Sequence, residues 1–182
     1  MTGMSHNLDG FAAFYRATST RTLRVLHRMT GGDRHIAADA LQDAYVVLAN
    51  AWPVRCERTF DDNRRYLVAI AANKVRDAYR ALNRYADLND EHEPAGEDPG
   101  IAAVLDELSA IRAIRDVIAG LPTRCRAVAV LYFLQDFGYR EIASVLDIRE
   151  STVRTHVERA RAVLQPHVDR FTELTREGRG HG

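Results

Sequence analysis

The segment from Val153 to Leu164 carries the residue types that read DNA. Its apolar residues Val153, Val157 and Leu164 recur at helical spacing, so they share the buried face of one predicted helix. Polar side chains occupy the other positions, and in a major groove they would meet base edges and phosphates. These polar residues are Arg154, Thr155, His156, Glu158, Arg159 and Arg161. Solvated charges on an amphipathic helix have the same pattern, so the preceding segment must decide between the two interpretations.

That preceding segment predicts a helix-turn-helix. Tyr139 and Leu146 lie on the inner face of a short predicted helix, and a turn follows at residues 147–150. The run 125–135 is apolar enough to form the buried helix that supports such a motif. Together these features favour DNA reading over a plain solvated surface.

A basic stripe is predicted on a helix that runs from about Arg65 to Arg84. One amide and three arginines recur there at intervals of three and four and share one face: Asn73, Arg76, Arg80 and Arg84. The opposite face is apolar. Such a stripe suits a nucleic-acid strand whose phosphates follow the arginines while the amide approaches a base. The alternative interpretation is that these residues form a solvated basic surface of the helix.

A further polar surface is predicted on the helix at residues 37–52, which Pro53 should close because proline lacks an amide hydrogen. The polar residues off its apolar face are Asp39, Gln42 and Asp43. Taken alone, they fit a solvated helix surface equally well. Residues 53–64 are then expected to form a polar loop with Phe60 near its end.

Helical periodicity covers most of the chain and strand-like alternation is missing, which predicts an all-α fold. Gly31 and Gly32 should end the first helix. Periodicity disappears at residues 85–100, where six carboxylates occur with prolines and glycines and without Lys or Arg. We therefore expect two small helical domains joined by a flexible linker. The expected division is 1–84, an acidic linker at 85–100, a second domain at 101–168 and a flexible tail at 169–182.

Composition limits the classes of function. The chain has 25 basic and 25 acidic residues, but residues 1–84 carry 13 basic against 8 acidic ones, so charge is segregated. Cys56 and Cys125 lack the spacing of a zinc site and cannot make a disulfide framework. No apolar run is long enough for a membrane span, and we expect a cytoplasmic protein without membrane insertion. Phosphate-loop, dinucleotide and metalloprotease motifs are missing, so we expect no enzymatic activity, cofactor or metal.

Three segments resemble bacterial sigma factors of the sigma-70 family, in its extracytoplasmic-function (ECF) group. LPTRCRAVAVLYFLQDFGYREIASVLDIRESTVRTHVERARAVL, at residues 121–164, is similar to sigma region 4. Asp147 stands where the turn of that family usually has glycine, so the resemblance implies a positive φ there, which aspartate tolerates less readily. ADALQDAYVVLANAW, at 38–52, and YLVAIAANKVRDAYRALNR, at 66–84, are similar to sigma region 2. The two regions occur in the order that the family has.

The resemblance implies an RNA polymerase subunit that directs promoter-specific initiation, and it implies a role for each polar surface. The polar residues from Arg154 to Arg161 would read the −35 promoter element and are called the −35 set. The −10 set would read and melt the −10 element and comprises Asn73, Arg76, Arg80, Arg84 and Phe60. The core-binding set would contact the polymerase β′ coiled coil and comprises Asp39, Gln42 and Asp43.

The implied partners are core RNA polymerase, through its β′ coiled coil and β flap, promoter DNA and an anti-sigma factor. Two other classes of function remain open. One is a helix-turn-helix regulator that binds DNA without acting as a polymerase subunit, with residues 1–84 as a sensing or dimerisation domain. The other is an interaction module that only sequesters a polymerase or a regulator.

Overall fold

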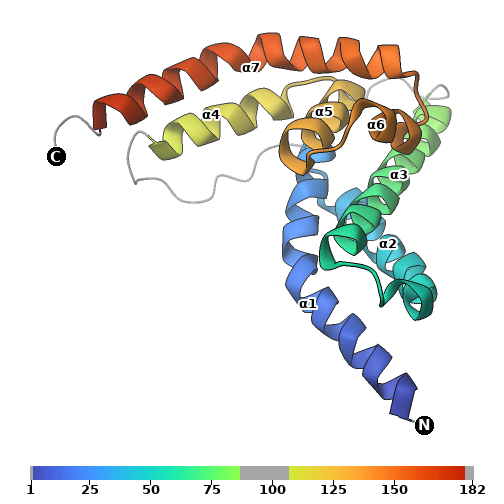
Figure 1. Cartoon of the computed structure of the whole chain (residues 1–182). Coiled ribbons are helices and arrows are strands. Elements are labelled where there is room, and N and C mark those ends of the chain that lie inside the picture. The colour runs from blue at the N-terminus through green and yellow to red at the C-terminus, as the bar shows by residue number, and fades with distance from the viewer. Residues whose placement is uncertain (1, 87–106, 179–182) are drawn as a thin grey trace.

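The fold is all-helical in a computed structural model that describes residues 2–86 and 107–178 (Figure 1). No strand occurs in these two ranges, so the predicted fold class is confirmed. The helices of the first part are α1 (Thr2–Met29), α2 (Arg34–Arg55) and α3 (Phe60–Ala86). Those of the second part are α4 (Glu107–Ala119), α5 (Thr123–Ala129), the π-helical turn η1 (Val130–Leu134), α6 (Tyr139–Leu146) and α7 (Glu150–Gly178). Most of the expected acidic linker lies outside the described residues.

The first three helices pack around an apolar core and are called the first module. Leu26, Leu48 and Leu67, one from each helix, are completely buried there. The Trp52 ring adds aromatic contacts to α1, with its centroid 5.3 Å from that of Phe11. Burying such large side chains is the main source of stability for a bundle of this size.

Gly31 and Gly32 end α1, as the sequence predicted, because both adopt a positive φ. Asp33 then caps α2, and its carboxylate accepts hydrogen bonds from the amides of His35 and Ile36 at 3.0 Å each. This short turn holds α1 and α2 side by side.

The predicted boundary at Pro53 is wrong. Pro53 lies inside α2, which continues to Arg55, and the amide of Cys56 still donates to the Trp52 carbonyl at 2.8 Å. A proline in the last turn removes only one helical hydrogen bond, so the turn survives. The predicted long loop is correspondingly short, at residues 56–59, because Thr59 accepts a hydrogen bond from the Asp62 amide and starts α3 early.

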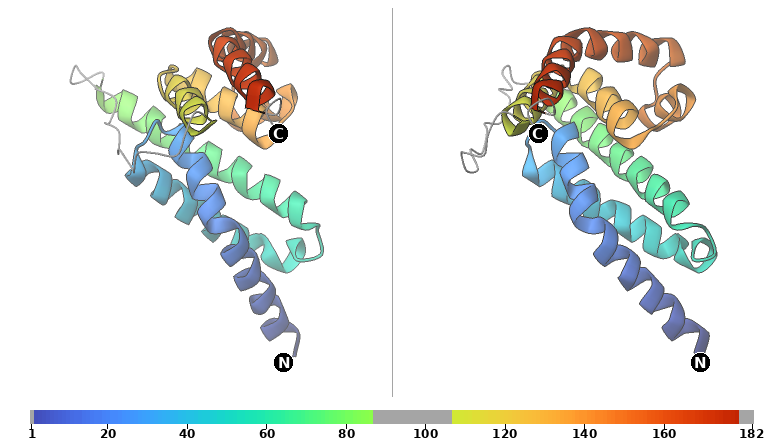
Figure 2. Two further views of the ribbon diagram at one scale, coloured as in Figure 1. Left: turned by 90° about the vertical axis from the view of Figure 1, so that its left-hand side faces the viewer. Right: turned by 60° about the vertical axis from the view of Figure 1, so that its left-hand side comes forward.

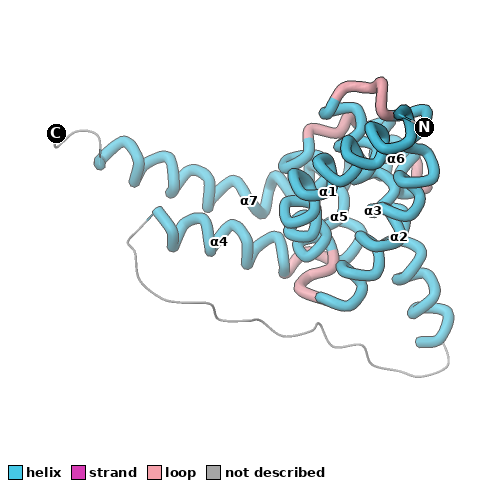
Figure 3. Tube along the Cα trace, turned by 90° about the horizontal axis from the view of Figure 1, so that it is seen from below, coloured by secondary structure: helices cyan, strands magenta, loops and turns pink. Residues whose placement is uncertain are grey.

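The helices α4 to α7, with η1, form the second module. In Figures 1 and 3, α4 and α7 run side by side and project away from the first module. Val128, Ile142 and Val153 are completely buried between its helices. The helix α7 runs without interruption through Pro166 to Gly178. None of the described helices is both long and apolar enough to cross a membrane.

The two modules pack directly against each other. Their buried side chains form one apolar cluster that contains Met29 and Val75 of the first module and Ala127 and Leu146 of the second. The two views of Figure 2 place α6 and α5 against α3 and the end of α1. Helices that the sequence assigned to separate domains therefore share an interface.

Candidate nucleic-acid interface

The turn between α6 and α7 has the geometry that the sequence predicted. Asp147 adopts the left-handed conformation, with φ 52° and ψ 53°, and its amide donates to the Ala143 carbonyl. The Ile148 amide also donates to Ala143 and its side chain packs into the core, so the turn is fixed on both sides. The Gly138 amide donates to Glu141 Oε2 at 2.7 Å and thereby closes the first turn of α6. The result is a helix-turn-helix in which α7 is the second helix.

The outward face of α7 carries most of the −35 set. Val153, Val157 and Ala160 are completely buried, and this fixes which face of the helix is free. The exposed members are Arg154, Thr155, Glu158, Arg159 and Arg161. The Arg154 guanidinium lies 5.2 Å from the Tyr139 ring centroid and 3.8 Å from Glu150, so contacts within the module hold it beside α6.

His156 differs from the other members of the −35 set. Its side chain is only partly exposed, and Nδ1 is buried without a hydrogen-bond partner among the described residues. Burial, followed by the charges of Arg159 and Arg124, lowers the pKa of the His156 imidazole. The lowered pKa favours the neutral form of the His156 ring, and the exposed members of the −35 set are better placed to reach bases.

The α3 stripe of the −10 set faces the second module. Arg76 donates from Nη1 to the Val145 carbonyl of α6 at 3.2 Å, and its other nitrogens contact Asp77. Arg80 pairs with Asp147 in the helix-turn-helix turn at 3.5 Å. Asn73 is partly buried and its Oδ1 has no partner in the described part of the chain, which costs about 1–3 kcal/mol. The side chain of Arg84 lies outside the described residues.

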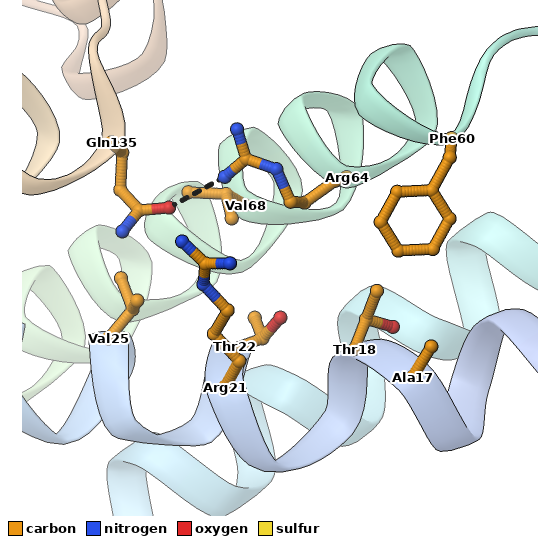
Figure 4. A pocket seen from close by; sticks show the side chains of 9 residues that line it. All are labelled: Ala17, Thr18, Arg21, Thr22, Val25, Phe60, Arg64, Val68 and Gln135. Carbon is orange, nitrogen blue, oxygen red and sulfur yellow. Dashed lines mark hydrogen bonds between the residues drawn. The ribbon is translucent and has the colours of Figure 1, made fainter.

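Phe60, the remaining member of the −10 set, lies far from this stripe. It is the first residue of α3, thirteen positions before Asn73, which corresponds to about 20 Å along a helix. Its ring is 52% exposed and packs against Phe14 at 5.3 Å. Figure 4 shows it at one end of a small cavity of about 40 Å³, with Arg64 and Gln135 at the other. Gln135 comes from the second module, so this cavity also lies where the modules meet.

The core-binding set forms one exposed face of α2. Asp39, Gln42 and Asp43 are all exposed, and Asp43 pairs with Lys74 of α3 at 3.2 Å. Val46 continues the same face and is 55% exposed. The sequence interpretation missed Val46, although its spacing from Gln42 and Asp43 was a usable signal. An exposed apolar side chain beside carboxylates suits a protein partner better than DNA.

Arg126 is a structural residue that the sequence interpretation also missed. It is only 7% exposed and donates from Nε to the Met29 carbonyl at 3.1 Å and from Nη1 to the Ala119 carbonyl at 2.8 Å. Nη1 also donates to the Leu121 carbonyl at 3.3 Å. Met29 and Ala119 end α1 and α4, so the guanidinium sits at the negative ends of two helices. Its place within the apolar run 125–135 was the available signal.

Nothing in the described residues points to metal chemistry. No group of three or more His, Cys, Asp or Glu side chains in those ranges could hold a metal ion. Cys125 is completely buried, and burial raises the pKa of its thiol, so it packs as a small apolar side chain.

The described surfaces define a helix-turn-helix protein with a second helical module that carries basic and acidic faces. Comparison with known proteins makes the class specific. The family model "Sigma-70, region 4" matches residues 111–164, which contain α5, η1, α6 and the first half of α7. The helix-turn-helix of this chain thus matches region 4 of the sigma-70 family, and the chain is similar over most of its length to ECF sigma factors.

Two curated relatives match over most of the chain. The ECF RNA polymerase sigma factor SigE of Mycolicibacterium smegmatis is 23% identical over 177 residues, which cover 96% of this chain and 67% of that protein. The ECF RNA polymerase sigma factor SigW of Bacillus subtilis is 29% identical over 174 residues, which cover 86% of this chain and 88% of that protein. Both matches extend through the first module as well as the helix-turn-helix.

Proposed function

We propose that this chain binds core RNA polymerase and directs initiation from promoters whose −10 and −35 elements it reads itself. The observation that carries the proposal is the pairing of a region 4 helix-turn-helix with a first module that is also matched in the two relatives. In this proposal residues 1–84 bind core polymerase and the −10 element, and residues 101–168 read the −35 element. Residues 85–100 connect the two, and residues 169–182 form the tail.

The exposed residues of α7 support the −35 assignment. Arginine pairs bidentately with guanine in the major groove, and Arg159 lies on the outward face of α7, opposite the buried Val153 and Val157. Arg154 and Arg161 would add phosphate contacts beside it. The −35 set would therefore supply both sequence reading and electrostatic attraction.

The exposed face of α2 supports the core-binding assignment. Its two carboxylates and its amide occupy adjacent turns, and Val46 supplies an apolar contact next to them. A basic helical partner such as the polymerase β′ coiled coil would complement this surface. The β flap is the proposed partner of the second module, and an anti-sigma factor is the proposed regulator. The proposed site of action is the cytoplasm.

Promoter-specific transcription in vitro with purified core RNA polymerase tests the proposal. The chain should convert core polymerase, which initiates without specificity, into an enzyme that starts at defined promoters. A variant with Gln42→Ala and Asp43→Ala should lose this activity, whereas the matched variant Asp9→Ala, on exposed α1 surface, should keep it. A regulator that is no polymerase subunit would only repress, and a sequestering module would inhibit core polymerase. Either result would remove the proposal.

A further inference from the structure

A cavity of about 180 Å³ lies where α3 of the first module meets α5 and α6 of the second, and it is called the interface cavity. It is larger than the cavity beside Phe60. Its lining has an apolar part and a part that carries three arginines. We propose that the interface cavity is a binding site for a compact aromatic carboxylate. The inference goes beyond the proposed function, because such a ligand would bind the free chain without DNA or polymerase.

The apolar part of the lining comes from three helices and sets the size of the ligand. Its buried side chains are Ala72 and Val75 of α3, Ala127 of α5 and Leu146 of α6. An apolar cavity of roughly 150 Å³ accepts one benzene ring. The interface cavity therefore has room for a single aromatic ring with a small substituent. A drug-sized ligand needs a pocket of roughly 300 Å³ or more, so a nucleotide, with its base, sugar and phosphate, is too large.

The charged part of the lining sets the sign of the ligand's charge. It comprises three guanidinium groups and one carboxylate, a formal charge of +2, from Arg76, Arg80, Arg124 and Asp147. Arg124 makes no hydrogen bond or ion pair within the described ranges, and the partner of Arg80 there is Asp147, at 3.5 Å. Both guanidinium groups therefore keep N–H donors for a further acceptor. Arginine donates to both oxygens of a carboxylate, so a carboxylate complements this lining.

A buried contact beside the interface cavity fixes the distance between its walls. Met29 and Ala127 both line the cavity, and Arg126, next to Ala127 in α5, donates from Nε to the Met29 carbonyl at 3.1 Å. Gly31 makes room for this guanidinium, since a Cβ at position 31 would lie 2.5 Å from Arg126 Nη1. The positive φ of Gly31 also disfavours other residues there. A site whose walls are already in place loses less free energy on binding than one that must first be ordered.

The exposure of the lining residues orients the ligand. Arg80 and Arg124 are exposed, whereas Val75 and Leu146 are buried, so the carboxylate would face solvent and the ring would lie inside. A carboxylate held at the solvent side keeps part of its hydration, which limits the cost of binding it. Because both modules contribute to the lining, the ligand binds only while they are packed together and stabilises that packing. A metabolite of this class would thus influence how readily the modules separate.

Titration of the free chain with benzoate, followed by NMR of the methyl groups, tests the site. Benzoate should bind with a dissociation constant of about 1 mM or lower. Nuclear Overhauser effects from its ring to the methyl groups of Val75, Ala127 and Leu146 should place it in the interface cavity. Benzamide lacks the charge, and acetate and inorganic phosphate lack the ring, so each should bind at least about 10-fold more weakly. Equal binding of any of these three, or no Overhauser effect to the lining, would overturn the proposal.

Variants test the charged and the apolar lining separately. Arg124→Gln removes one charge of the lining and should weaken benzoate binding about 3- to 10-fold. The matched control is Arg140→Gln, an exposed arginine of α6 outside the lining, which should bind benzoate like wild type. Ala127→Leu fills the interface cavity and should weaken binding more than about 10-fold, with circular dichroism reporting whether the variant folds. Wild-type affinity of Arg124→Gln would overturn the proposal even if Ala127→Leu did not fold, because Arg124 is exposed.

Discussion

Replacing Arg126 by methionine should destabilise the whole chain, because one buried side chain joins both modules. Methionine fills a similar volume but donates no hydrogen bond, so the carbonyls of Met29, Ala119 and Leu121 lose their donor. At about 1–1.5 kcal/mol for each of the three unsatisfied groups, the free energy of unfolding should fall by about 3–4.5 kcal/mol. This is a large share of the roughly 5–15 kcal/mol that stabilises a typical protein. The midpoint of thermal unfolding should drop by roughly 6–18 °C.

Urea unfolding followed by circular dichroism and by fluorescence of Trp52 measures this loss. Trp52 is buried in the first module, so its fluorescence reports whether a change in the second module reaches the first. The matched variant is Arg124→Met, which replaces an exposed arginine on the same helix and should change the free energy of unfolding by less than about 0.5 kcal/mol. If Arg126→Met lost less than about 1 kcal/mol, the assigned role of its buried guanidinium would be refuted.

The remaining predictions concern recognition. Arg154→Ala and Arg159→Ala should each weaken −35-dependent transcription by about 5- to 150-fold, which is equivalent to the 1–3 kcal/mol of a good base contact. The circular dichroism of both variants should be unchanged. If both variants transcribed like wild type, the assignment of α7 as the −35 reading helix would be wrong. Replacing Gln42 and Asp43 by alanine should lower the affinity for core polymerase in a pull-down. The fold should persist, because both side chains are exposed. Undiminished capture of core polymerase would count against the core-binding set. Six carboxylates occur at residues 87–98, outside the described residues, and changing them to amides should reduce initiation more strongly at low salt than at moderate salt. If the variant and wild type transcribed equally at both salt concentrations, those carboxylates would have only a solubilising role.

The helix-turn-helix was predictable from sequence because its signals are local. Apolar spacing assigned the buried face of α7, and the resemblance to sigma region 4 identified Asp147 as the turn residue with a positive φ. The prediction that α2 ends at Pro53 was wrong for an equally local reason. A proline removes one hydrogen bond and does not by itself end a helix whose last turn is held by its neighbours.

The packing of the two modules could not be predicted from sequence. The α3 arginines recur with a spacing that suits DNA phosphates and protein carboxylates equally, so periodicity alone does not identify their partner. Glu141 and Asp147 are distant from that stripe along the chain and carry no signal that they face it. Only the three-dimensional arrangement brings those charges together.

The close fit of Gly31 and Arg126 has an evolutionary consequence. The guanidinium occupies the space that a Cβ at position 31 would need, so the two positions constrain each other although they belong to different modules. A lineage that replaced the glycine would have to shorten the arginine or give up the contact. Chains that close in this way should therefore retain glycine and arginine together or lose both together. This pair is a signature by which the same closure could be recognised in other sequences.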